Sequence, residues 1–410
     1  MIRLIRGYSS LDPEQQMTLT YDKLYVDEVQ DYTQAEIAFF YLLCKKGGLF
    51  LAGDTAQSVE YGVAFGFEEV RSVAHSLYKG DKHYIPDKPL RVHINFRSHA
   101  GILNIASSIL DRLFAWFPRS AHKLKNDEGL FLGPRPGLIQ LDENDFKQFM
   151  IKNKGIVILV HDEKVSIYKK MLGSDQVILG IRESKGLEFN DVIVLNFFAD
   201  LDNEHQKPWR DLLSMKEMIE EGKKKPELEP QLKLLYTAIT RCCKRLFFIQ
   251  TTETISGKAF IRWTIEQKLA EKQSSSTIEI ARTPDEWRTT GVDYATIADS
   301  CESSSTAVEW LDRAIGCFKQ VNETKLIRKA QTNKDSVKLR VILDELDLTQ
   351  TSDDDLVNHE SHVSQLVYSC LEEGITPEAR KICIALVPYL SEFMQAKIER
   401  EVIEKIERIS

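Results

Sequence analysis

Several features of secreted and membrane proteins are missing from this sequence. No run of about eighteen consecutive apolar residues occurs, and the first residues, MIRLIR, are too short and too interrupted for the apolar core of a secretory signal. The seven cysteines include no Cys-x-x-Cys pair and no His/Cys cluster at metal-ligand spacing, and Cys242 and Cys243 are adjacent. We therefore expect no disulfide framework and no zinc site. The sequence predicts a soluble intracellular protein, nuclear or cytoplasmic, with no membrane partner.

An excess of positive charge is also missing. The net charge is −8, and residues 266–410 hold 18 basic and 27 acidic side chains, whereas residues 1–265 are close to neutral with 36 basic and 35 acidic. One stretch, residues 90–125, is mainly basic. It contains Arg91, Arg97, Arg112, Arg119, Lys123 and Lys125 against the single acidic residue Asp111. Such a stretch fits contacts to a few phosphates or a solvated helix face, and the charge pattern leaves both interpretations open.

What is present is an ordinary globular composition. With 410 residues and 43% hydrophobic content, the chain can form roughly two or three domains with buried cores. Short apolar runs typical of buried strands alternate with helical stripes, and no tight hairpin turns separate them. These runs are residues 24–26, 49–52, 155–160, 177–179, 192–195 and 246–249. The alternation predicts parallel sheets, and after residue 273 helix-start signals at Thr283 and Thr376 replace the strand-like runs.

The clearest chemical signature is in residues 24–31, with the sequence LYVDEVQD. An apolar run ends in acidic residues, so a buried strand would deliver Asp27 and Glu28 to the carboxyl end of a parallel sheet, where ligands bind. Two adjacent carboxylates at that position suit a Mg²⁺-nucleotide site, in which one holds the metal and the other polarises an attacking water. A strand followed by an acidic turn has the same pattern, so the interpretation depends on other segments.

Five segments, in this order, resemble motifs of the superfamily-one helicases of the UvrD/Rep type. They are the DExx segment at residues 24–31 (LYVDEVQD), the Gly-Asp-x-x-Gln-Ser loop at 51–58 (LAGDTAQS), the Asn-Tyr-Arg-Ser segment at 94–98 (INFRS), the Ser-Lys-Gly-Leu-Glu-Phe loop at 183–189 (ESKGLEF) and the Leu-Tyr-Val-Ala-x-Thr-Arg helix at 235–241 (LYTAITR). The resemblance covers residues 20–250. It implies an α/β fold with two RecA-like lobes of the P-loop type, each with a parallel sheet.

The resemblance implies an ATP site with Mg²⁺ as the metal. Asp27 would hold Mg²⁺, and Glu28 would activate the attacking water. Gln57 would sense the γ-phosphate and link the two lobes. Arg97 and Arg241 would reach the transferring phosphoryl group from the second lobe, because a planar bidentate guanidinium fits phosphate oxygens.

The resemblance also implies contacts to the nucleoside and to single-stranded DNA or RNA. Glu188 would accept hydrogen bonds from the ribose, and Gly186 would allow close approach of the backbone. Phe65 and Phe67 stand where relatives place an aromatic that stacks on a base, although both residues also fit a hydrophobic core. Arg182 stands where the family usually has a histidine near the phosphodiester, and it keeps the positive character.

The chain departs from the family pattern in three places. Residues 64–67 are AFGF in place of Arg-Gly-Ala, so the coupling contact of that loop is not carried over. Too few residues separate Arg97 from Gly186 for the inserted subdomain of bacterial relatives. No Gly-x-x-x-x-Gly-Lys-Ser/Thr occurs anywhere, so the β- and γ-phosphates lack their cradle of backbone amides and a lysine. We therefore expect an N-terminally truncated portion of a larger protein, with ATP hydrolysis impaired.

Three parts are expected along the chain. Residues 1–88 would form an incomplete first RecA-like lobe, residues 89–265 the second lobe, and residues 266–410 an all-α tail. Within the tail, Trp287, Gly291 and the segment AIGCF that ends at Phe318 resemble tetratricopeptide (TPR) repeats. In the eukaryotic TPR and ankyrin repeat-containing proteins, such repeats follow a UvrD-like helicase core. The tail would then bind a protein partner.

Two functions are consistent with the sequence. The first is an ATP-dependent helicase or translocase on single-stranded nucleic acid, with ATP and Mg²⁺ as cofactors. The second is a non-catalytic, helicase-like scaffold joined to a helical protein-interaction tail. An upstream P-loop with hydrolysis stimulated by single strands favours the first function. An upstream reading frame without a P-loop, with no detectable nucleotide binding, favours the second.

Overall fold

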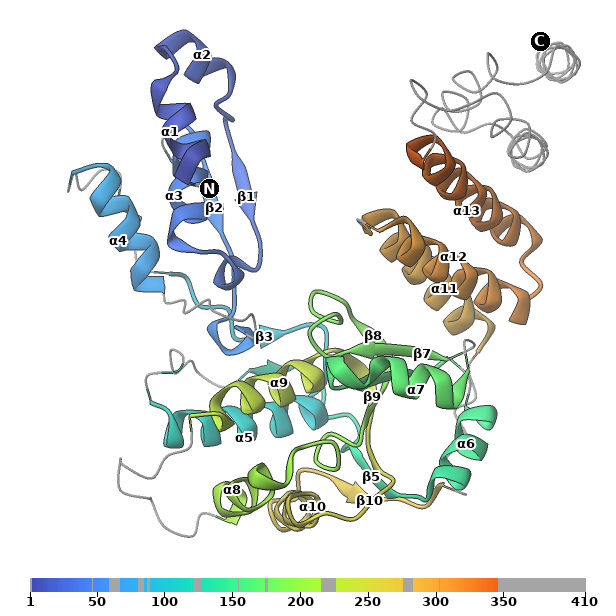
Figure 1. Ribbon diagram of the computed structural model, residues 1–410. Coiled ribbons are helices and arrows are strands. Elements are labelled where there is room, and N and C mark those ends of the chain that lie inside the picture. The colour runs from blue at the N-terminus through green and yellow to red at the C-terminus, as the bar shows by residue number, and fades with distance from the viewer. Residues whose placement is uncertain are drawn as a thin grey trace, which may run out of the picture. The chain divides into compact units, whose positions relative to one another are not determined.

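The structure of the protein is a computed structural model. It describes residues 2–45, 47–58, 67–79, 85–86, 89–118, 120, 127–153, 155–173, 176–214, 226–275, 283–301 and 303–345. The chain divides into two compact units, Met1–Glu279 and Ile280–Ser410, and each is described by itself (Figure 1). The division into three parts that the sequence suggested stays a prediction. The helix-start signal at Thr376 lies outside the described residues.

The first sheet of unit Met1–Glu279 consists of two short parallel strands. Its elements, with those around it, are α1 (Ile2–Ser10), α2 (Pro13–Thr18), β1 (Leu24–Val26), η1 (Val29–Asp31), α3 (Gln34–Leu43), β2 (Leu49–Leu51), η2 (Thr55–Gln57) and α4 (Phe67–Leu77). Leu24 pairs with Leu49 in register. Helix α3 begins at a capping box, in which Thr33 and Glu36 each accept a hydrogen bond from the other's backbone N–H. The helices α3 and α4 bury one core with η1.

A larger sheet has six strands, all parallel, in the order β10-β5-β9-β8-β6-β7. The strands are β5 (Gly137–Gln140), β6 (Val157–Val160), β7 (Val177–Gly180), β8 (Phe189–Leu195), β9 (Cys242–Gln250) and β10 (Glu271–Lys272). All four residues of β6 and of β7 are buried, which is why both strands read as unbroken apolar runs. A separate parallel pair is formed by β3 (Ile94–Asn95) and β4 (Glu128–Gly129). The expected mixed α/β fold with parallel sheets is confirmed.

Helices cover the six-stranded sheet. They are α5 (Ala100–Trp116), α6 (Glu143–Lys152), η3 (Asp162–Lys164), α7 (Val165–Leu172), α8 (Asn203–Ser214), α9 (Leu228–Thr240) and α10 (Ile255–Glu266). Helix α5 packs against α9, and the two run side by side in Figure 1, while α8 packs against α10. Phe198 and Trp209 meet edge to face, with ring centroids 5.2 Å apart, in the core beneath α8. Because α9 is buried along most of its length, packing against its neighbours fixes the position of this helix and of Arg241, which follows it.

Unit Ile280–Ser410 is helical over its described residues 283–301 and 303–345. Its helices are α11 (Pro284–Ser300), α12 (Ser304–Gln320) and α13 (Thr324–Glu345), and each packs against the next along the chain. Leu311, Ile315 and Phe318 are buried on one face of α12. Phe318 packs against Gly291 of α11. Among the helices of the described part of the whole chain, none is long and apolar enough to cross a membrane.

The contact between Gly291 and Phe318 makes a testable prediction about the packing of α11 on α12. A Cβ atom at residue 291 would lie 2.5 Å from the Phe318 ring. Gly291→Ala should therefore lower the free energy of unfolding by about 1–3 kcal/mol, measured by urea denaturation followed through tryptophan fluorescence. Gly316→Ala is the control, because a Cβ there has no atom within 4 Å and should raise helix stability by about 0.5–1 kcal/mol. Equal stabilities of the two variants would contradict this packing.

Candidate functional site

The acidic segment places two carboxylates directly after β1. Asp27 is exposed, and its Oδ1 accepts a hydrogen bond of 2.9 Å from the backbone N–H of Glu28. Glu28 is half-buried and has a left-handed backbone with φ of +51°, which is uncommon for a residue other than glycine. Its carboxylate accepts a hydrogen bond from the side-chain amide of Gln30. Backbone strain of this kind is concentrated at functional sites, so it adds to the chemical interest of the pair.

Gln30 joins the loop after β1 to the loop after β2. Its side chain is fully buried, and its amide oxygen accepts a hydrogen bond of 2.9 Å from the backbone N–H of Asp54. A Cβ atom at Gly53 would lie 2.3 Å from this oxygen, so only glycine allows so close an approach. The Gln30 side chain therefore adds to the backbone hydrogen bonds between Val29 and Ala52 and between Ala52 and Val26 that join the carboxyl ends of β1 and β2.

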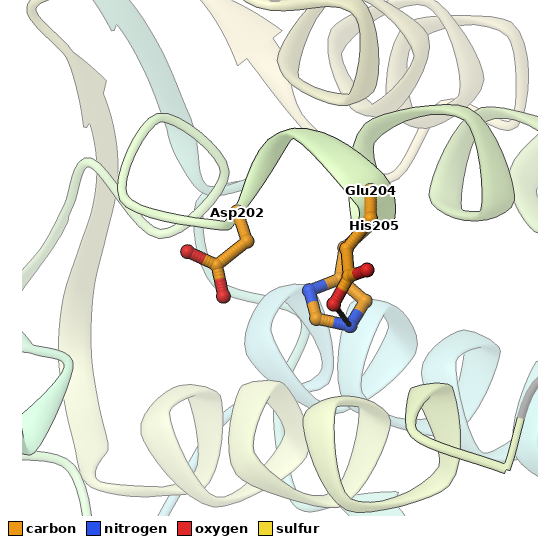
Figure 2. A group of neighbouring side chains, drawn as sticks. All are labelled: Asp202, Glu204 and His205. Atoms are coloured by element: carbon orange, nitrogen blue, oxygen red, sulfur yellow. Dashed lines mark ion pairs between the residues drawn. The ribbon is translucent and has the colours of Figure 1, made fainter.

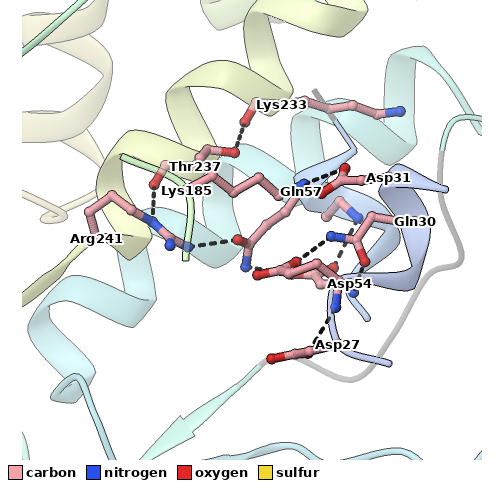
Figure 3. Close-up of polar contacts among 11 residues, drawn as sticks. Asp27, Gln30, Asp31, Asp54, Gln57, Lys185, Lys233, Thr237 and Arg241 are labelled. Atoms are coloured by element: carbon pink, nitrogen blue, oxygen red, sulfur yellow. Dashed lines mark hydrogen bonds and ion pairs between the residues drawn. The ribbon is translucent and has the colours of Figure 1, made fainter. Parts of the chain in front are cut away.

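The carboxylate of Asp54, which lies beside Gln57 in Figure 3, accepts hydrogen bonds from three donors. Its Oδ1 accepts from the backbone N–H of Ala56 at 2.9 Å. Its Oδ2 accepts from the side-chain amide of Gln57 at 3.1 Å and from the hydroxyl of Tyr236 at 3.2 Å. The amide oxygen of Gln57 in turn accepts a hydrogen bond of 2.6 Å from Nη2 of Arg241. Loop 51–58 thus meets helix α9 and the residue that follows it.

Arg241 is almost completely buried, with 1% of its surface exposed. Its other hydrogen bonds go to the backbone oxygens of Thr237 and Leu187, each at 3.2 Å, and to the hydroxyl of Thr240. Burial lowers the pKa of the Arg241 guanidinium, and the charge of the nearby Glu28 carboxylate opposes this shift. The four acceptors of its hydrogen bonds within the described part of the chain are neutral oxygens, and none of these four contacts is to a carboxylate.

Arg97 and Glu188 contact one another. They form an ion pair in which 47% of the arginine side chain and 38% of the glutamate side chain are exposed. The sequence analysis assigned Arg97 to the phosphoryl group and Glu188 to the ribose of a nucleotide. In the structure the guanidinium of Arg97 pairs with the carboxylate of Glu188. Gly186, two residues before Glu188, has φ of +76°, and a Cβ there would have no atom within 4 Å. Glycine is thus favoured at this position by the backbone conformation, and space does not require it.

Lys185 and Asp31 form a second connection between the segments. The ammonium donates to both carboxylate oxygens, at 2.5 and 2.6 Å, and only 8% of the lysine side chain is exposed. This contact ties loop 183–189 to η1. The residues lie 154 positions apart, so their pairing could not be deduced from spacing, although both belong to motifs that the sequence analysis quoted.

Of the residues assigned to nucleic acid, Phe67 and Arg182 lie in the described part of the chain. Arg182 follows β7 and forms an ion pair of 2.9 Å with Asp162, whereas Arg241 directly precedes β9. Phe67 begins α4 and packs against the core of Val29, Ile37, Val70 and Val73, which is the hydrophobic-core interpretation left open above. Phe65 lies outside the described residues. The sequence did not single out Phe96, whose ring is 78% exposed beside Arg97.

The basic stretch at residues 90–125 does not form one uniform surface. Arg91 is exposed, but Arg112 is buried with its guanidinium 5.4 Å from the centroid of the Trp263 ring. A cation over an indole face is a packing contact, so Arg112 belongs neither to a solvated helix face nor to a phosphate contact. The remaining basic residues of the stretch, Arg119, Lys123 and Lys125, lie outside the described residues.

A separate group of possible metal ligands lies at the start of α8. Among the described residues, Asp202, Glu204 and His205 bring one ligand atom each to within 4.8 Å of one another. Figure 2 shows Glu204 and His205 facing each other, at 3.9 Å between Oε1 and Nε2, with Asp202 to one side. The N-terminal end of a helix carries partial positive charge, which disfavours a cation. We assign no metal to this group, and Asp27 remains the residue expected to hold Mg²⁺.

The fold and the cluster define a mixed α/β protein with parallel sheets, in which loops after two strands meet the end of a buried helix. No protein-family model matches the chain. It is similar to TPR and ankyrin repeat-containing protein 1 of Homo sapiens, with 33% identity over 328 residues that cover 67% of this chain. The chain spans only 11% of the length of that human protein. The expected similarity to this group of proteins is confirmed, and the wider resemblance to UvrD/Rep helicases stays a prediction.

The ion pair of Lys185 with Asp31 should contribute to stability, because the lysine is almost buried. Lys185→Met removes the ammonium that donates to both Asp31 carboxylate oxygens, and we expect a loss of about 2 kcal/mol in the free energy of unfolding, less than the roughly 3–5 kcal/mol of a fully buried pair. Lys45→Met is the control, since Lys45 pairs with Asp22 at the same 2.5 Å but is 52% exposed, and should cost less than about 0.5 kcal/mol. Urea denaturation measures both, and similar losses would show that loop 183–189 is not held through this contact.

Proposed function

We propose that unit Met1–Glu279 supplies part of the ATP site of a UvrD/Rep-like helicase or translocase that acts on single-stranded DNA or RNA. The hydrogen bond between Gln57 and Arg241 is the main support for this proposal. These residues are 184 positions apart and meet beside the loop that carries Asp27 and Glu28. In this proposal the two parallel sheets belong to two RecA-like lobes, and the cluster lies where the lobes meet.

The geometry suits phosphoryl transfer. Asp27 is exposed and free to hold Mg²⁺ through its water shell, and Glu28 is oriented by Gln30 to position and activate the attacking water. The hydrogen bonds that Arg241 makes within the described residues go to neutral oxygens, and its charge lies in a buried setting where electrostatic stabilisation of the transferring phosphoryl group is strongest. An arginine in this role accounts for about 10³ to 10⁵ in rate.

Arg97 can exchange its partner when a nucleotide binds. A half-exposed ion pair contributes only about 0–1 kcal/mol, so a triphosphate with its greater negative charge displaces Glu188 at little cost. Glu188 is then released to accept hydrogen bonds from the ribose. The exposed ring of Phe96 beside Arg97 offers a flat apolar surface on which a base can stack.

One part of a complete ATP site is missing from the 410-residue sequence. It contains no Gly-x-x-x-x-Gly-Lys-Ser/Thr, so the β- and γ-phosphates meet arginines but no cradle of backbone amides. We propose that this chain binds ATP weakly and does not turn it over, and that hydrolysis needs a P-loop from another segment.

The second candidate function is a non-catalytic scaffold, and the missing P-loop favours it. In a scaffold, the contacts of Arg241 with Gln57 and of Lys185 with Asp31 serve stability alone. The helices of unit Ile280–Ser410 then bind a protein partner, as TPR-like helices do in repeat proteins. Nucleotide binding separates the two candidates.

We expect this chain to bind Mg²⁺ and a fluorescent ATP analogue, and Arg97→Gln to weaken the affinity about tenfold, because a charge-assisted hydrogen bond contributes about 1.5–3 kcal/mol. Arg210→Gln is the matched control: Arg210 is 48% exposed and pairs with Asp211, which is 38% exposed. Fluorescence titration measures all three proteins. If the unsubstituted chain binds no nucleotide at millimolar concentration, the scaffold function is supported.

Glu28→Gln tests the catalytic role in any longer form of the protein that carries a P-loop. We expect nucleotide binding to be retained and hydrolysis stimulated by single strands to be lost, because an amide cannot activate the water. Phosphate release with and without single-stranded DNA or RNA is the measurement. An unchanged rate would remove Glu28 from the mechanism, and measurable release by the present chain would show that a cradle is not required.

A further inference from the structure

We propose that Tyr236 and Asp54 are positioning residues that fix the side-chain amide of Gln57 and thereby let the site distinguish a nucleoside triphosphate from a diphosphate. The inference rests on the proposed function, because it concerns how Gln57 meets the γ-phosphate. Neither residue touches the nucleotide in this proposal. They act through the orientation of one amide group.

The orientation of the Gln57 amide follows from hydrogen-bond chemistry. A carboxylate accepts hydrogen bonds and donates none, so the group of Gln57 that lies 3.1 Å from Asp54 Oδ2 must be the NH₂. The amide oxygen is then on the other side, where it accepts from Arg241 at 2.6 Å. If the amide turned over, its NH₂ would face the guanidinium, which also only donates. Asp54 and Arg241 together therefore allow one orientation.

Tyr236 holds the carboxylate of Asp54 in place. Its hydroxyl donates to the same Oδ2 at 3.2 Å, and only 7% of the tyrosine is exposed. Burial raises the pKa of Tyr236 well above its usual value, and the charge of Asp54 acts in the same direction, so the hydroxyl keeps its proton and remains a donor. Tyr236 lies on α9, and Arg241 directly follows the end of this helix, so one helix sets the position of both contacts to loop 51–58.

The contacts continue to the acidic segment. The backbone N–H of Asp54 donates to Gln30, and the amide of Gln30 donates to Glu28. A continuous series of hydrogen bonds therefore runs from α9 through Asp54 to the carboxylate that would activate water. Loss of the Tyr236 hydroxyl removes one of the donors that hold the Asp54 carboxylate, so this carboxylate and the Gln57 amide that donates to it are less firmly fixed in position. In this proposal a γ-phosphate would then meet a less well placed amide, whereas a diphosphate would not reach Gln57 and would be unaffected.

Tyr236→Phe in the full chain tests the proposal by fluorescence titration with the Mg²⁺ complexes of labelled ATP and ADP. We expect the affinity for ATP to fall about five- to tenfold, the change that one hydrogen bond produces, and the affinity for ADP to change less than about twofold. Tyr168→Phe is the matched control. Tyr168 is also 7% exposed and donates to an aspartate, Asp200, at 2.9 Å, so it loses the same kind of contact away from the cluster.

A second variant shows whether Tyr236 acts through Gln57. In a Gln57→Ala background, Tyr236→Phe should change the affinity for ATP less than about twofold, because the amide that it orients is already absent. A further loss in that background, an unchanged ratio of ATP to ADP affinity in Tyr236→Phe, or an equal effect of Tyr168→Phe would each overturn the positioning role alone. No binding of either nucleotide by the unsubstituted chain would overturn the proposed function together with this inference.

Discussion

The carboxylate of Asp54 is the contact on which the arrangement of the candidate site depends. It accepts hydrogen bonds from its own loop, from Gln57 and from Tyr236 on α9, so it determines how loop 51–58 meets the helix that precedes β9. Asp54 is half-buried, and a carboxylate can accept hydrogen bonds from several donors at once. Its backbone N–H adds the link through Gln30 to the acidic segment.

Three cationic side chains of the candidate site, Lys185, Arg97 and Arg241, differ in the groups that they contact. Lys185 is nearly buried and directly paired with Asp31, which is the arrangement of a structural contact. Arg97 is half-exposed and paired with Glu188, so its partner is exchangeable. Arg241 is buried, and its hydrogen bonds among the described residues go to neutral oxygens, while the charge of the nearby Glu28 carboxylate favours the charged guanidinium. Burying a charge is costly unless a group of opposite charge lies nearby.

The residues around Asp54 lie in a chain that is similar to human TPR and ankyrin repeat-containing protein 1. That protein is much longer, and the chain corresponds to a small part of it. The name of the relative speaks of repeats, whereas the described part of unit Met1–Glu279 consists of parallel sheets and covering helices. The residues around Asp54 therefore belong to a part of the chain whose architecture of parallel sheets is unlike a helical repeat.

The sequence by itself determined the element types, because apolar runs of strand length and helical stripes are local patterns. It predicted the parallel sheets and the position of Asp27 and Glu28 after a strand, but the strand was expected to be buried, whereas Tyr25 of β1 is exposed and Val26 is the one buried residue of the three. Only the tertiary structure decided which polar groups pair. The contacts of Arg241 with Gln57 and of Lys185 with Asp31 join residues more than 150 positions apart, and such pairs depend on how sheets and helices pack rather than on neighbouring residues. Packing likewise buried Arg112 against Trp263, although charge alone left it indistinguishable from exposed arginines.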